Sequence, residues 1–95
     1  MGDDGAMRSA VDVTVTGRVQ GVSFRYYAER EADRLGVAGW VRNEPDGTVA
    51  AHVEGAPGAV DGFVRWCHDG PRLAHVERVD VRDGTDEGLT SFGVR

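Results

Sequence analysis

The stretch VDVTVTGRVQGVSFRYYAEREADRLG, residues 11–36, sets the architecture of this chain. Its first six residues alternate valine with a polar residue, a period of two that is typical of a half-buried strand. Apolar residues then recur at helical spacing, at Phe24, Ala28, Ala32 and Leu35. Ser23 is typical of an N-cap and Gly36 of a helix end. The stretch therefore predicts a strand, a loop and an amphipathic helix of about three turns.

The rest of the chain continues with the same two kinds of element. VAGWVRN (37–43) and TVAAHVEG (48–55) predict a hairpin of two strands joined by the turn EPDG. Pro57 suits the first turn of a second helix. That helix has its own apolar stripe, formed by Val60, Phe63, Val64 and Cys67. A fourth strand is expected at residues 74–82 and a short closing strand at residues 91–95.

The predicted order is strand, helix, strand, strand, helix, strand, with one extra short strand. Two split strand–helix–strand units of this kind form a ferredoxin-like βαββαβ sandwich of the α+β class. We expect both helices on one face of an antiparallel sheet, with the other face in solvent. The change of parity among Val76, Val79 and Val81 predicts a β-bulge in the fourth strand.

Length and composition predict one small domain without a disulfide. The chain has 95 residues, and we assign residues 10–95 to the domain and residues 1–9 to a mobile N-terminal tail. The single cysteine excludes an internal disulfide, and no stretch approaches the roughly 20 apolar residues of a membrane span. The start lacks the features of a signal peptide. We therefore expect a cytoplasmic monomer with no membrane partner.

The charge balance argues against a nucleic-acid partner. The formal net charge is −5, so the average field repels a polyanion. Binding of single-stranded RNA on the open sheet face is a further alternative, but the aromatic run of RNA-recognition folds is missing. Exposed charges are screened beyond about 8 Å at physiological salt. A local cluster of hydrogen-bond donors can therefore still bind phosphate.

The loop GRVQGVSFR, residues 17–25, is the strongest local signal for a binding site. Gly17 and Gly21 permit the backbone to curl so that amide N–H groups converge at the N-terminus of the helix. Such a nest binds anions, and phosphate is its natural ligand. The loop matches neither the Walker A pattern nor GxGxxG, so nucleoside triphosphates are not implied.

Three polar side chains near this loop each have two interpretations. Arg25 lies in the first helical turn and could grip two phosphate oxygens, or it could pair with Glu29 on the surface. Asn43 precedes the EPDG turn, where it could simply favour the turn or could orient a water for in-line attack on phosphorus. Gln20 could contribute to the site or be an ordinary polar loop residue.

Other reactive residue types point to no second site. His52, His68 and His75 are too scattered to predict a metal site. Cys67 lies on the apolar stripe, so we expect a buried side chain rather than a nucleophile. The acidic segment DGTDEG, residues 83–88, is interpreted as a solvated loop.

Residues 17–25, GRVQGVSFR, and residues 39–55, GWVRNEPDGTVAAHVEG, resemble the two signature segments of the acylphosphatase family, in the same order and at a compatible separation. The element order over residues 10–95 is similar to the five-stranded ferredoxin-like fold of that family. The resemblance implies an enzyme that hydrolyses acyl phosphates to a carboxylate and inorganic phosphate, with no metal and no organic cofactor.

The resemblance also implies roles for individual residues. Arg25 would bind the phosphoryl group and Asn43 would position the attacking water. The substrate would be bound by the loop amides, those of Arg18, Val19, Gln20, Gly21, Val22 and Ser23. The leaving carboxylate is a stable anion that needs no general acid, so the lack of an obvious acid–base pair fits this chemistry. A non-enzymatic anion-sensing module is the alternative, because the fold is widely reused.

Overall fold

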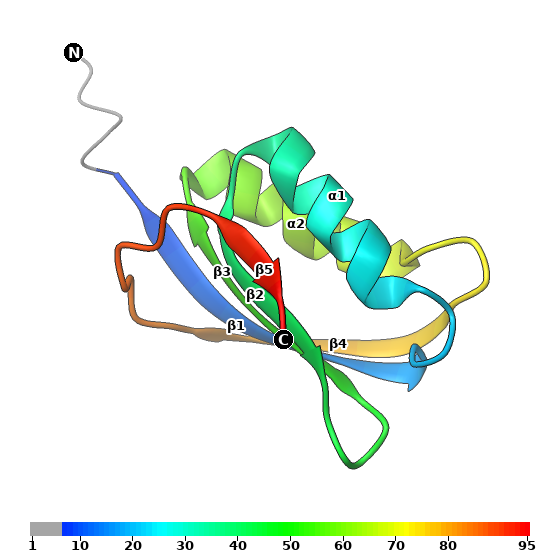
Figure 1. Cartoon of the computed structure of the whole chain (residues 1–95). Helices are drawn as coiled ribbons and strands as arrows, with labels where there is room; N and C mark the ends of the chain where they lie inside the picture. The colour runs from blue at the N-terminus through cyan, green and yellow to red at the C-terminus, as the bar shows by residue number, and fades with distance from the viewer. Residues whose placement is uncertain (1–6) are drawn as a thin grey trace.

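The computed structural model describes residues 7–95, so the first six residues of the predicted tail lie outside the described residues. Over these described residues, two helices and five strands follow one another (Figure 1). Their bounds are β1 (Ser9–Arg18), α1 (Phe24–Leu35), β2 (Ala38–Asn43), β3 (Val49–Gly55), α2 (Pro57–Asp69), β4 (His75–Asp83) and β5 (Phe92–Val94). Neither helix in the described part of the chain is long and apolar enough to cross a membrane.

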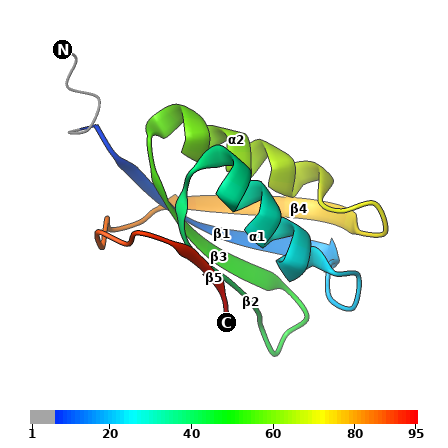
Figure 2. The same ribbon diagram turned by 45° about the horizontal axis from the view of Figure 1, so that its top comes forward.

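The five strands form one sheet in the order β4-β1-β3-β2-β5, and both helices cover the same face of it (Figures 1 and 2). This confirms the ferredoxin-like fold of the α+β class. Three pairings are antiparallel as predicted, but β5 runs parallel to β2, so the sheet is mixed. The reason is topological: residues 84–91 carry the chain from one edge of the sheet to the other, and β5 then runs opposite to β4.

The core lies between the helices and the inward side chains of the strands. Val13 and Val15 of β1 pair with Ala51 and Val49 of β3, and all four side chains are buried. Phe63 of α2 is fully buried, with its ring centroid 5.5 Å from that of Phe92 in β5. Burial of each large apolar side chain contributes about 1.5–3 kcal/mol, so these contacts fix α2 and β5 on the sheet.

Helix α1 has the predicted bounds but not the predicted N-cap bond. Ser23 has a left-handed backbone, with φ 64° and ψ 27°, and its side chain makes no capping hydrogen bond. The tight curl of the preceding loop imposes this conformation, which overrides the usual geometry of a serine N-cap. At the other end, Gly36 has φ 76° and its N–H donates to the carbonyl of Ala32 at 2.8 Å, as expected for a C-terminal glycine.

The predicted bulge in the fourth strand is present. Thr16 pairs with Arg78 whereas Gly17 pairs with Val76, so Glu77 is the extra residue of β4. A Cβ atom on Gly17 would lie 2.2 Å from the carbonyl oxygen of His75. Gly17 therefore allows the two backbones to approach where β1 ends and the loop begins.

The sheet face without helices is not simply in solvent, because His52 and Glu54 of β3 are buried there, with exposures of 2% and 0%. Glu54 accepts hydrogen bonds from the backbone N–H of Glu87 at 2.9 Å and of Leu89 at 2.7 Å. The acidic segment 83–88 is largely exposed as expected, with only Gly84 half-buried, but the backbone there also packs over a buried carboxylate. Its crossing from β4 to β5 brings it there.

Strand β1 begins at Ser9, two residues before the alternating stretch that predicted it. Ser9 is already the first residue of β1 and pairs with Gly55. Arg8 donates from Nη2 to Glu54 at 3.2 Å and from Nε to Asp86 at 2.8 Å. Ser9 thus pairs within the sheet, and Arg8 adds a cationic partner to a buried carboxylate that His52 and two backbone amides also bond.

Candidate active site

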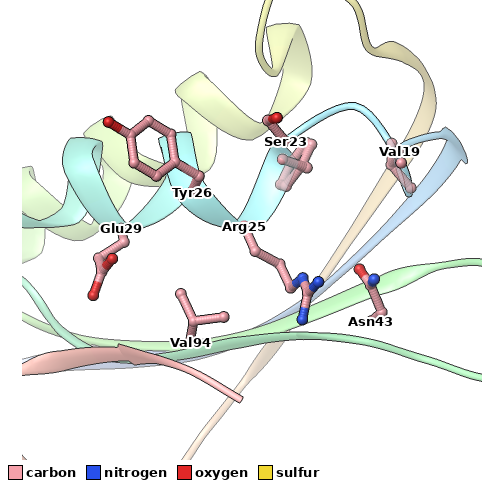
Figure 3. A pocket seen from close by; sticks show the side chains of 9 residues that line it. Val19, Ser23, Arg25, Tyr26, Glu29, Asn43 and Val94 are labelled. Atoms are coloured by element: carbon pink, nitrogen blue, oxygen red, sulfur yellow. The ribbon is translucent and has the colours of Figure 1, made fainter.

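One pocket of about 510 Å³ lies where the β1–α1 loop, the start of α1, the end of β2 and β5 meet. Figure 3 shows this pocket from close by. Its lining residues are Val19, Gly21, Ser23, Phe24, Arg25, Tyr26, Glu29, Asn43 and Val94. The two residues predicted to carry the chemistry, Arg25 and Asn43, are both among them.

The loop on one side of the pocket has the curled backbone that the sequence predicted. Gly21 and Ser23 both have positive φ, 74° and 64°. Val19 between β1 and this curl is 1% exposed and anchors the loop in the core. A Cβ atom on Gly21 would meet nothing within 4 Å, so the curl is open at that point. The first turn of α1 carries no acidic side chain, which leaves the positive end of the helix dipole available to an anion.

Arg25 extends from the first turn of α1 toward Asn43 rather than toward Glu29 (Figure 3). Within the described residues no ion pair joins Arg25 to Glu29, and Nη1 of Arg25 instead donates to the backbone carbonyl of Arg95 at 3.4 Å. The surface-pair interpretation of Arg25 is therefore not supported. Arg25 is a half-buried residue and borders the pocket that the open loop also lines.

Asn43 is the last residue of β2 and pairs with Val49 of β3. The turn that follows is closed by other groups: the N–H of Glu44 donates to the carbonyl of Thr48 at 2.8 Å, and Asp46 accepts bonds from Thr48. The Asn43 side chain points toward Arg25 (Figure 3). This geometry favours a role in the pocket over a role in the turn.

Only three of the six loop residues that were predicted to bind substrate line the pocket. Val19, Gly21 and Ser23 line the pocket, whereas Arg18, Gln20 and Val22 do not. Val22 borders a neighbouring, more apolar pocket that also includes Ser23 and Leu73. The Gln20 carboxamide is bonded to backbone carbonyls of the β2–β3 turn. Substrate binding by the loop amides stays a prediction.

Four residues that the sequence did not place at a site also line the pocket: Phe24, which was expected only in the core, and Tyr26, Glu29 and Val94. Tyr26 and Glu29 follow Arg25 by one residue and by one helical turn, so helical spacing alone could have suggested Glu29. Val94 comes from β5, at the far end of the sequence. No local pattern indicates its position, because it depends on the parallel pairing of β5 with β2.

The lone cysteine is unsuited to catalysis. Cys67 is buried in α2, and burial raises the pKa of its thiol to about 12. A thiol with this pKa supplies almost no thiolate near neutral pH. In residues 7–95 no three His, Cys, Asp or Glu side chains are grouped so that they could hold a metal ion.

Comparison with known proteins identifies the family. The family model for acylphosphatase matches residues 11–94 of this chain. The chain belongs to the acylphosphatase family. The acylphosphatase of Nocardioides sp. is 92% identical over 94 residues, which are 99% of this chain and 95% of that protein. The chain is thus an enzyme of this family, as the two sequence segments predicted.

Solved structures of the same family have the same fold. An acylphosphatase from Coxiella burnetii superposes with a TM-score of 0.92 at 32% identity, covering 100% of both chains. The acylphosphatase from Bacillus subtilis gives a TM-score of 0.89 at 37% identity, covering 94% of this chain and 99% of that one.

Proposed function

We propose that this acylphosphatase-family enzyme hydrolyses acyl phosphates with the amides of residues 18–23, Arg25 and Asn43. Water attacks phosphorus, the bond from phosphorus to the acyl oxygen breaks, and the products are a carboxylate and inorganic phosphate. The loop amides and the Arg25 guanidinium bind the phosphoryl oxygens. The Asn43 carboxamide holds the water in line with the bond that breaks.

The observation that carries this proposal is that Arg25 and Asn43 line one pocket and point toward one another (Figure 3). They come from α1 and β2, so only the fold brings them together. A guanidinium can bind two phosphoryl oxygens, and a carboxamide at its side can accept a hydrogen bond from water. Phosphoryl transfer requires this combination of an anion clamp and a fixed nucleophile.

The reaction requires no general acid and no general base from the side chains of the pocket. The carboxylate leaves as a stable anion, so no side chain has to protonate it. Positioned donors act on the charge of the phosphoryl oxygens, and one such donor is commonly worth about 10²–10³ in rate. Asn43 cannot accept a proton at neutral pH. We therefore assign the proton of the attacking water to the phosphate group of the substrate itself.

The test is hydrolysis of benzoyl phosphate by purified protein in excess EDTA, because the proposed reaction uses no metal. We expect Arg25→Ala to lose both substrate binding and turnover, and Asn43→Ala to lose mainly kcat. Arg65→Ala is the matched control, since Arg65 is an exposed arginine of α2 outside the pocket. Unchanged kcat/KM in Arg25→Ala would show that the site is wrongly assigned.

The outcome also separates the enzyme from its alternative. Phosphate binding that depends on Arg25, without turnover of any acyl phosphate, would indicate an anion-sensing module. We expect the enzyme to be a cytoplasmic monomer without a cofactor, and sedimentation of the purified protein tests the monomer.

A further inference from the structure

The proposed reaction depends on the spacing of two segments that are distant in sequence. The loop of residues 18–23 would bind phosphate, while Asn43 at the end of β2 would hold the water. A displacement of about 1 Å between reacting groups can cost a factor of about 10² in rate. Some group must therefore fix the loop relative to the end of β2.

The Gln20 side chain makes that connection. Its Nε2 donates to the carbonyl oxygen of Glu44 at 2.8 Å and to the carbonyl oxygen of Thr48 at 2.8 Å. Glu44 directly follows Asn43, and Thr48 directly precedes its β3 partner Val49. Two carbonyl acceptors require the NH₂ group of the amide, which uses both of its hydrogens here.

We propose that Gln20 is a positioning residue that ties the phosphate loop to the strand end carrying Asn43. This inference rests on the proposed function. Gln20 lies between Val19 and Gly21, which both line the pocket, while its own side chain points into the hairpin. One carboxamide thus holds the two walls of the site at a fixed separation.

The hairpin itself does not need these bonds. Its turn is already closed by the bond from the Glu44 N–H to the Thr48 carbonyl and by the bonds of Thr48 to Asp46. A carbonyl oxygen has two lone pairs. At Thr48 one of them accepts the bond from the Glu44 N–H, and the other is free to accept the bond from Gln20. The bonds from Gln20 therefore position the loop against the hairpin rather than close the turn.

The loop, in contrast, has a conformation that needs support. Ser23 holds a left-handed backbone without a side-chain cap, a conformation that is unfavourable for any residue with a Cβ atom. Such conformations persist only where their surroundings fix them. Val19 fixes the loop through burial on the core side, and Gln20 fixes it through hydrogen bonds on the hairpin side.

Two substitutions remove the bonds in different ways. Gln20→Met keeps the approximate shape and removes the donor, and Gln20→Glu keeps the shape but turns a carboxylate toward two carbonyl oxygens. We expect kcat for benzoyl phosphate to fall about 10-fold to 100-fold in both, with the larger loss in Gln20→Glu. The inhibition constant of inorganic phosphate should change much less, because the loop amides remain.

A double-mutant cycle with Asn43→Ala separates positioning from a general loss of structure. If Gln20 acts by aligning Asn43 with the phosphoryl group, Gln20→Met should cost little further kcat once Asn43 is replaced. Val60→Ala is the stability control, because it weakens the buried face of α2 outside the pocket. It should lower Tm without the kcat loss.

The outcomes are distinguishable from those of the proposed function. If Asn43→Ala keeps full kcat, the proposed mechanism is wrong and this inference falls with it. If Asn43→Ala loses kcat while folded Gln20→Met keeps it, only the positioning role is wrong. An equal loss from Gln20→Met with and without Asn43 also overturns the inference.

Discussion

His52 and Glu54 form a buried ion pair on the sheet face without helices, with Nε2 of His52 2.6 Å from Oε2 of Glu54. Nδ1 of His52 lies 2.7 Å from Oδ1 of Asp12. Burial acts to lower the pKa of His52, but its bonds to Glu54 and Asp12 raise that pKa above the ordinary 6.5. For Glu54, burial acts to raise the pKa, whereas bonds from the Glu87 and Leu89 amides and from His52 hold it below 4.5.

These opposite shifts predict how stability depends on pH. The contribution of His52 is complete below pH 6.5 and is lost as pH rises through its raised folded-state pKa. The contribution of Glu54 is complete above pH 4.5 and is lost as pH falls through its lowered folded-state pKa. We therefore expect the free energy of unfolding, measured by urea denaturation, to decrease as pH rises above 6.5 and through the raised pKa of His52.

The matched variant is His52→Gln, which cannot titrate in this range. It should lose about 3 kcal/mol of stability near pH 6, because Glu54 stays buried with one fewer partner. Its stability should then be nearly flat as pH rises above 6.5, where the wild type loses stability. If the stability of the wild type and of His52→Gln falls in parallel as pH rises, the His52–Glu54 pair does not cause the loss of stability at alkaline pH.

Gly39 in β2 should not tolerate a side chain. Its φ is 142°, and a Cβ atom would lie 1.7 Å from the carbonyl oxygen of His52 in the paired strand β3. Backbone on both sides prevents relief, because Gly39 also pairs with Phe92 of β5. We expect Gly39→Ala to cost about 4 kcal/mol of stability or to prevent folding.

Gly58→Ala is the matched control for that loss. Gly58 lies in the first turn of α2, and a Cβ atom there would meet nothing within 4 Å. Alanine should therefore stabilise the protein by about 0.5–1 kcal/mol through its helix propensity. If urea denaturation gives similar stability for both variants, the close approach at Gly39 does not constrain the sheet.

Features that depend on local periodicity were predictable from the sequence. The alternation of residues 11–16 and the apolar stripe of α1 each bury one face, so α1 has the expected bounds and β1 includes the expected residues, extended at both ends to Ser9 and Arg18. The bulge at Glu77 was predictable because the apolar residues of β4 change from an even position, Val76, to odd positions, Val79 and Val81. These patterns are local because a strand repeats every two residues and a helix about every 3.6.

Features that depend on which distant segments meet were not predictable. Arg8 and the Leu89 amide reach Glu54 from opposite ends of the chain. Val94 enters the pocket only because β5 pairs with β2. For the site itself, the glycine pattern indicated the curled loop, but the bonds from Gln20 to the β2–β3 turn have no signature in composition or spacing.

Cys67 should be unreactive in the folded protein. Its thiol is buried in α2, and its pKa of about 12 leaves almost no thiolate at neutral pH. We expect a thiol reagent to label it only after unfolding in denaturant. Cys67→Ala should keep kcat/KM and lose about 1 kcal/mol of stability, since it removes a small buried group. Rapid labelling of folded enzyme with loss of activity would contradict this placement.

Arg25→Lys tests whether the pocket requires the shape of a guanidinium or only its charge. Lysine keeps the positive charge but is a point donor that cannot bind two phosphoryl oxygens in one plane. We expect kcat/KM for benzoyl phosphate to fall about 10²-fold, close to the loss in Arg25→Ala. Steady-state kinetics of both variants at one ionic strength provides the comparison.

The kinetics at different salt concentrations then separate the two contributions. The attraction of a positive charge for an anionic substrate is screened by salt, whereas aligned hydrogen bonds in the pocket are screened much less. Arg65→Lys controls for a change of cation on the surface of α2. If Arg25→Lys has wild-type kcat/KM at low salt and loses it only at high salt, charge alone suffices. The direction of the guanidinium toward Asn43 would then have no part in catalysis.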